Sequence, residues 1–150
     1  MNTRQQLLTY EDKLRKAKKL VPLASVNWTA YIPKEAGVYV LWKGNVPSYV
    51  GETSSLQLRM RDLARPINHS FTKKIAKELG LPANATKKIA QAISSSFKLS
   101  FVTVEFGRAE IEEFLILRWR NTLINKPAKR LEHSPQYRWV AELATREKSA

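Results

Sequence analysis

Two tyrosines and an arginine lie close together in the sequence, in a pattern that suits chemistry on a phosphodiester. Tyr39 ends the tripeptide Gly37-Val38-Tyr39, Tyr49 begins Tyr49-Val50-Gly51, and Arg59 follows ten residues after Tyr49. A phenol can donate or accept a hydrogen bond, and a guanidinium presents a fixed fork of donors to phosphate oxygens. The chain has a formal net charge of +13 at pH 7, which favours a polyanionic partner.

These residues are predicted to lie on a β-hairpin that leads into a helix. Residues 37–43 form a run of β-branched and aromatic side chains, and residues 48–53 form a second such run. Between them, Gly44-Asn45 is a turn signal. Residues 56–64 have apolar side chains on one helical face, and the arginine lies beside that face.

Whether the two tyrosines share a face of the hairpin depends on its register, because side chains alternate between the faces of a strand. With a two-residue turn, Tyr39 would stand opposite Val50, and the tyrosines would point to opposite faces. With a loop of odd length, Tyr39 would stand directly opposite Tyr49. A shared site therefore requires the odd-length loop. On spacing alone, both tyrosines could equally be ordinary strand aromatics.

The remaining elements complete an α+β pattern. Helices are predicted over residues 4–20, 70–79, 85–96, 109–121 and 135–146, and a third strand is predicted over residues 98–106. This order predicts a small three-stranded antiparallel or mixed sheet flanked by helices. At 150 residues the chain is expected to form a single domain, residues 1–150.

The composition indicates a nucleic-acid partner in a reducing compartment. Lys and Arg number 26 against 13 Asp and Glu, and neutralised phosphates release counterions. The chain has neither an apolar run of 18 residues nor a secretory signal, so no membrane partner is expected. It has no cysteine, which suits a cytoplasmic location, with nucleoid association in a bacterium. The sequence leaves the oligomeric state open.

Taken together, the two tripeptides, Arg59 and a later glutamate-bearing helix resemble the GIY-YIG nuclease family over about residues 30–125. The resemblance implies the same α+β architecture and a metal-dependent endonuclease that hydrolyses DNA, with double-stranded DNA as the expected substrate. In this interpretation Tyr49 acts as general base, Tyr39 supports it by hydrogen bonding, and Arg59 stabilises the charge that develops on phosphorus. The implied cofactor is Mg²⁺ or Mn²⁺.

The metal would require a carboxylate from the helix at 109–121. The family pattern is a glutamate followed by apolar residues at +3 and +4, then a proline and an asparagine. Counted from Glu113, the asparagine falls on Asn125, whereas the proline position holds Thr122. Glu113 is therefore the preferred ligand and Glu112 the alternative. Acidic residues in a first helical turn also stabilise the helix dipole without any metal.

Basic residues outside this set are candidates for contacts with the nucleic acid. They are Lys43, His69, Lys73, Lys74 and Lys77. For each lysine the alternative is a solvated side chain, and for His69 a surface histidine without a role. The four tryptophans are expected in the core, although Trp42 could instead stack on a base.

Two further interpretations of the sequence remain open. One is a non-catalytic nucleic-acid-binding module that keeps the nuclease fold, and the other is a basic RNA-associated protein. The complete set Tyr39, Tyr49, Arg59 and a helix glutamate favours the nuclease. The sequence does not predict which DNA sequence or structure is recognised, or whether the pathway is repair, restriction or mobile-element transfer.

Overall fold

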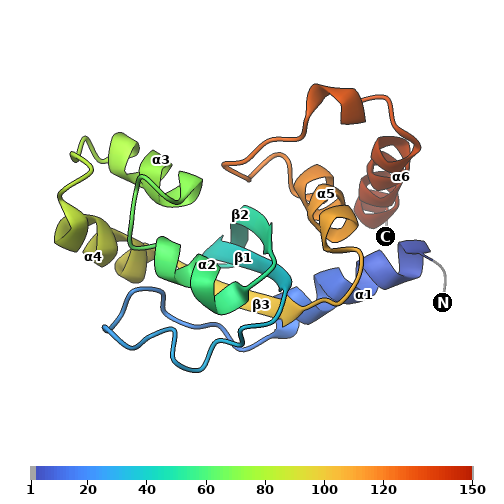
Figure 1. The fold of residues 1–150 in the computed structure, drawn as a ribbon. Coiled ribbons are helices and arrows are strands. Elements are labelled where there is room, and N and C mark those ends of the chain that lie inside the picture. The colour runs from blue at the N-terminus through green and yellow to red at the C-terminus, as the bar shows by residue number, and fades with distance from the viewer. Residues whose placement is uncertain (1–2, 150) are drawn as a thin grey trace.

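The computed structural model describes residues 3–149 and is built around an antiparallel sheet with the strand order β2-β1-β3 (Figure 1). The strands are β1 Gly37–Lys43, β2 Val46–Thr53 and β3 Lys98–Thr103. The helices are α1 Thr3–Lys16, α2 Leu56–Asp62, α3 Ser70–Glu78, α4 Thr86–Ser96, α5 Arg108–Arg118 and α6 Pro135–Ser149, with a 3-10 turn η1 at Lys129–Leu131. The predicted α+β class with three strands flanked by helices is confirmed, and every pairing is antiparallel.

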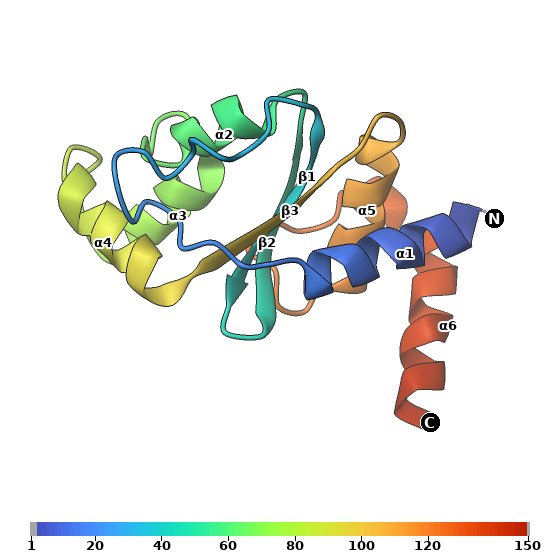
Figure 2. The same ribbon diagram turned by 90° about the horizontal axis from the view of Figure 1, so that it is seen from below.

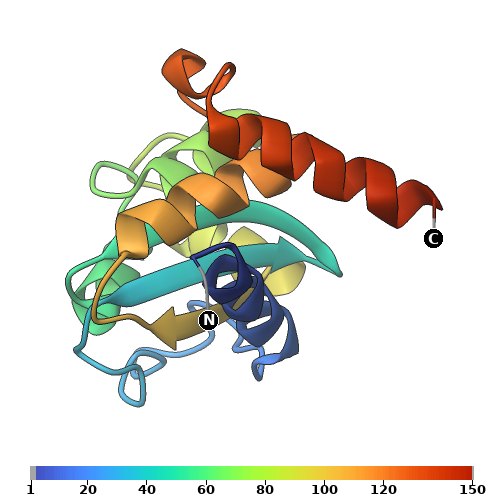
Figure 3. The same ribbon diagram turned by 90° about the vertical axis from the view of Figure 1, so that its right-hand side faces the viewer.

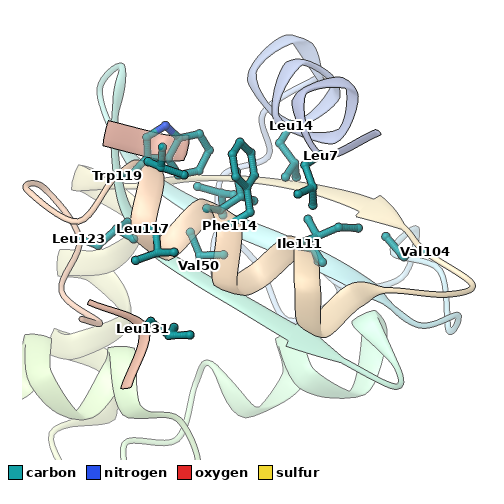
Figure 4. Close-up of a cluster of buried hydrophobic side chains, with 14 of the residues drawn as sticks. Leu7, Leu14, Val50, Val104, Ile111, Phe114, Leu117, Trp119, Leu123 and Leu131 are labelled. Atoms are coloured by element: carbon teal, nitrogen blue, oxygen red, sulfur yellow. The ribbon is translucent and has the colours of Figure 1, made fainter. Parts of the chain in front are cut away.

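The two faces of the sheet are covered by different helices, as Figure 2 shows. Because side chains alternate along β1, Val38 and Val40 face a core formed with α1, α5 and α6. Figure 4 shows side chains of this core that come from α1 and α5. Tyr39 and Leu41 face the opposite core, formed with α2, α3 and α4. Residues 37–42 of the central strand are therefore buried on both sides, and the charged Lys43 lies at its exposed end.

Helix α6 packs on the outer side of α5, away from the sheet (Figure 3). The rings of Phe114 on α5 and Trp139 on α6 stack with their centroids 5.3 Å apart. Arg118 of α5 also binds the carboxylates of Glu11 and Glu147, which belong to α1 and α6. These contacts hold α5 in a fixed position over β2.

Helix α1 is shorter than the predicted helix over residues 4–20, since it ends at Lys16. Leu20 instead pairs with β3: its backbone N–H and C=O each bond to Leu99 at 2.8 Å. A backbone that completes a sheet edge cannot also continue a helix. Within residues 3–149, none of the helices has the length and apolar character needed to cross a bilayer.

The hairpin has a register that the sequence did not indicate. Lys43 pairs with Val46, so the turn at Gly44-Asn45 has two residues, and the expected odd-length loop is wrong. A bulge then shifts the pairing, and Leu41 stands opposite Tyr49. The extra residue of a bulge changes the parity of the strand. Tyr39 and Tyr49 therefore share a face despite the even turn.

The outer edge of β2 is covered by the segment that follows α5. The backbone N–H of Ile124 donates to the carbonyl of Ser48 at 2.7 Å. The side-chain amide of Asn125 accepts from Val50 N–H at 3.3 Å and donates to Val50 C=O at 2.6 Å. This segment is thereby fixed next to the strand that carries Tyr49.

Candidate functional site

The phenols of Tyr39 and Tyr49 lie side by side on one face of the sheet. Their ring centroids are 6.3 Å apart, and the ring planes differ by 25°. The cross-strand partner of Tyr39 is Gly51 rather than Tyr49. A Cβ atom at Gly51 would collide with the ring and hydroxyl of Tyr39. The missing side chain of Gly51 is what allows the Tyr39 phenol to lie across β2.

Gly51→Ala is therefore expected to destabilise the protein by roughly 1–3 kcal/mol, because a well-packed site cannot absorb an added methyl group. The free energy of unfolding from urea titrations measures this cost. The same substitution made in a Tyr39→Leu background is the control. There the collision is relieved, so the two changes should be strongly non-additive. Additive costs would mean that Tyr39 does not require the space over Gly51.

The Tyr39 hydroxyl is held by a buried histidine at the start of α3. The distance between Tyr39 Oη and His69 Nε2 is 2.9 Å, and His69 Nδ1 accepts the backbone N–H of Phe71 at 3.2 Å. Burial first, and then the charge of Arg59, lower the pKa of His69 to about 3. The ring is therefore neutral, and with Nδ1 accepting, its hydrogen is on Nε2. His69 donates to the Tyr39 oxygen, which leaves the Tyr39 hydrogen available for another acceptor.

This placement corrects the expectation that His69 contacts a phosphate. Only 1% of its surface is exposed, and both ring nitrogens already have partners within the protein. As the N-cap of α3, its side chain turns back toward the first backbone amides of the helix instead of outward. His69 positions Tyr39.

His69 should make the stability of the protein depend on pH. Its pKa is 6.5 when unperturbed and about 3 when folded, so the unfolded chain binds more protons between these values. The stabilisation is complete above pH 6.5 and is lost as the pH falls toward 3, by at most about 1.4 kcal/mol per pH unit. We expect His69→Gln to show a shallower loss in urea titrations over this range. His133→Gln, which removes an exposed histidine, should behave like the wild type.

Tyr49 is held by the next residue of the same helix. Tyr49 Oη lies 2.7 Å from Ser70 Oγ, and its ring packs edge-on against Phe71 with the centroids 5.6 Å apart. The start of α3 therefore positions both phenols. Burial, followed by the neighbouring Tyr49, raises the pKa of Tyr39, while the charge of Arg59 opposes the rise. Tyr39 is a neutral phenol near pH 7.

Arg59 of α2 supplies the positive charge of this site. Its Nη1 donates to the carbonyl of Asn68 at 2.8 Å and lies 3.5 Å from the carboxylate of Asp62. The side chain remains 28% exposed, and its charge acts on both tyrosines. The guanidinium is thus fixed beside the two phenols and still open to an incoming anion.

The two glutamates considered as metal ligands lie in different surroundings. Glu113 accepts a hydrogen bond from Arg130 Nη2 at 3.0 Å on the surface. Glu112 is half-buried, and its charge acts on Tyr39. Burial first, and then the charge of Glu52, raise the pKa of Glu112 to about 7. The glutamate on the side of the tyrosines is therefore Glu112, the alternative, whereas the preferred Glu113 is engaged by Arg130.

The surroundings of Glu112 fit a divalent cation held by few protein ligands. The part of the chain described, residues 3–149, has no group of three or more acidic or histidine side chains that could enclose a metal. Mg²⁺ does not require one, since it is commonly bound by one or two carboxylates, waters and substrate phosphate. A cation beside Glu112 would offset its repulsion by Glu52, which is itself bound by Arg108 at 2.5 Å.

The lysines proposed for nucleic-acid contacts divide into two groups. Lys73, Lys74 and Lys77 lie exposed along α3, and Lys74 Nζ donates to the carbonyl of Ile124 at 3.4 Å. Lys74 therefore lies between α3 and the segment at the β2 edge. Lys43 lies at the hairpin end of β1, about 13 Å from Tyr39 along the strand.

Sequence reasoning missed two residues of the site, Ser70 and Glu52. Ser70 follows His69 in a polar stretch, and only the docking of α3 against β2 brings its hydroxyl to Tyr49. Glu52 follows Tyr49-Val50-Gly51 directly. Its acidic side chain beside the second tripeptide was a signal that could have been used.

Comparison of the chain with known protein families, with curated proteins and with solved structures finds no match in any of the three. The site geometry and the sequence motifs are therefore the basis for proposing a function.

Proposed function

We propose that this protein is a DNA endonuclease of the GIY-YIG type that depends on Mg²⁺ or Mn²⁺. The observation that carries the proposal is the gathering of three groups at the edge of β2. Two phenols with centroids 6.3 Å apart lie beside a guanidinium whose charge acts on both. The net charge of +13 supports a polyanionic substrate.

In the proposed reaction Tyr49 removes a proton from the attacking water. The phenolate is the form of a tyrosine that accepts a proton, and nearby positive charge favours it. Arg59 supplies such a charge. Tyr39, whose oxygen is already bonded to His69, has its own hydrogen free to donate to the Tyr49 phenolate or to the phosphate.

Arg59 has a second role in this scheme, because its exposed donors can bind the charge that develops on the phosphoryl oxygens. Glu112 is the residue that would hold the metal. A bound divalent ion would supply charge stabilisation to the leaving 3′ oxygen. Lys73, Lys74 and Lys77 would contact the DNA backbone on either side of the scissile bond.

Incubation with supercoiled plasmid tests the proposal. The protein should nick or linearise the plasmid with Mg²⁺ or Mn²⁺ and lose this activity in EDTA. Tyr49→Phe is the matched variant, because it keeps the ring packed on Phe71 and removes only the hydroxyl. Binding of DNA without cleavage across several divalent metals would instead favour the non-catalytic module.

A further inference from the structure

A second concave surface lies on the other side of α2, away from the two tyrosines. It is a cavity of about 680 Å³ between the segment that precedes β1 and the helices α2 and α4. Its walls include Leu23, Val26, Trp28, Arg61, Arg65 and Ala90. Arg61 lies about 200° around the helix from Arg59, so α2 presents Arg59 to the tyrosines and Arg61 to this cavity.

The cavity wall is held in place by buried hydrogen bonds. The Gln57 side chain is 7% exposed and donates to the carbonyls of Thr29 at 3.3 Å and Ile32 at 3.2 Å. Leu23 has a φ of 60°, a left-handed conformation that a branched side chain adopts only where the surrounding structure imposes it. The segment that precedes β1 therefore has a fixed conformation and is held against α2.

The chemistry of the cavity combines an aromatic ring with two cations. Trp42, Trp119 and Trp139 are core residues with 2%, 7% and 6% of their surface exposed. Trp28 is half-buried: it packs against the core on the α2 side of the sheet and also lines the cavity. Arg61 near the end of α2 and Arg65 in the loop that follows α2 both line the cavity. Arg61 Nη2 also donates to Gln57 Oε1 at 3.4 Å, and none of the eleven lining residues is acidic.

We propose that this cavity binds an unpaired nucleotide of a single-stranded nucleic acid. The base would stack on Trp28, and the flanking phosphates would bind Arg61 and Arg65. Aromatic platforms beside cationic grooves bind single strands in this way without regard to sequence. A duplex has its base faces already stacked, so it cannot place a base on Trp28 and has no flanking phosphates held at the two arginines. The cavity volume lies within the range of about 300–1,000 Å³ typical of small-molecule sites.

Fluorescence anisotropy with a labelled oligothymidylate, measured in EDTA, tests this proposal by binding alone. Trp28→Ala should weaken binding of the oligothymidylate by roughly tenfold and change the affinity for a duplex of equal length little. Trp28→Phe should retain most of the affinity, because it keeps an aromatic face. Thermal unfolding identifies any variant that fails to fold.

The double variant Arg61→Ala with Arg65→Ala keeps the test decisive if Trp28 proves necessary for folding. It should also weaken single-strand binding more than duplex binding. Lys87→Ala with Lys88→Ala removes the same charge from the exposed side of α4 and should lower both affinities equally. Equal losses for both DNA forms in the arginine variant, or none, would refute the proposal. Because no cleavage is measured, this result is independent of whether the protein is a nuclease.

Discussion

Arg59→Ala is expected to lower the single-turnover rate of DNA cleavage by roughly 10² or more, as loss of a transition-state charge partner does. The structure gives the reason: Arg59 is the cation whose charge acts on both phenols, and its side chain remains partly exposed. DNA affinity should change little, since one phosphate contact among many is a small share of the total. Arg59→Lys should recover only part of the rate, because lysine lacks the fixed fork of donors.

The double variant Lys73→Ala with Lys74→Ala is the matched comparison. Both lysines are exposed on α3, so their loss should weaken binding but spare the rate at saturating DNA, since only interactions that strengthen in the transition state speed the chemistry. Thermal unfolding controls for the hydrogen bond from Arg59 to Asn68. If Arg59→Ala cleaves saturating DNA at the wild-type rate, Arg59 is a structural residue and the proposed site is wrong.

Glu112→Gln should lower the cleavage rate at least as much as Arg59→Ala does. A metal ion contributes several kcal/mol of transition-state stabilisation, so loss of its protein ligand is expected to lower cleavage by roughly 10²–10³. Binding of Mn²⁺ in the presence of a non-cleavable DNA, followed by electron paramagnetic resonance, gives a readout that does not depend on activity. In the Glu112→Gln variant, both the affinity for Mn²⁺ and the cleavage rate should fall.

Glu113→Gln is the paired variant, one residue along the same helix. It removes the surface ion pair with Arg130 and the smallest of the repulsions that act on Glu112, and exposed pairs contribute at most about 1 kcal/mol. Near-normal cleavage is expected. If Glu113→Gln is the variant that loses Mn²⁺ and activity, the family spacing to Asn125 identifies the ligand better than the geometry does, and Arg130 must release Glu113 when DNA binds.

The elements of this fold were predictable because their boundaries carry strong local signals. The hairpin was indicated by Gly44-Asn45 between two β-branched runs. The three-strand α+β arrangement followed from the order of helices and strands. The early end of α1 was not predictable, because it depends on Leu20 pairing with Leu99, a residue far along the chain. The helix propensity of the residues around Leu20 carries no information about a pairing with so distant a residue.

The site was predictable to a lesser extent. Tyr39, Tyr49 and Arg59 followed from spacing, but their common face depends on a bulge at Ser48 that shifts the register by one residue. The burial of His69 was hidden for a related reason, since a cap residue next to a helix resembles a surface residue in sequence. Glu112 and Glu113 differ by about 100° around a helix axis, and only packing fixes which of them faces β2.

The contact between Asn125 and Val50 has a consequence for self-association. A side-chain amide offers the same pair of donor and acceptor as a peptide group, so Asn125 occupies the place that the backbone of another chain would take on β2. Strands with open edges are templates for aggregation and domain swapping. The protein thereby closes the edge beside its tyrosines with the short segment at Ile124 and Asn125 rather than with a further strand, so a second molecule cannot extend the sheet there.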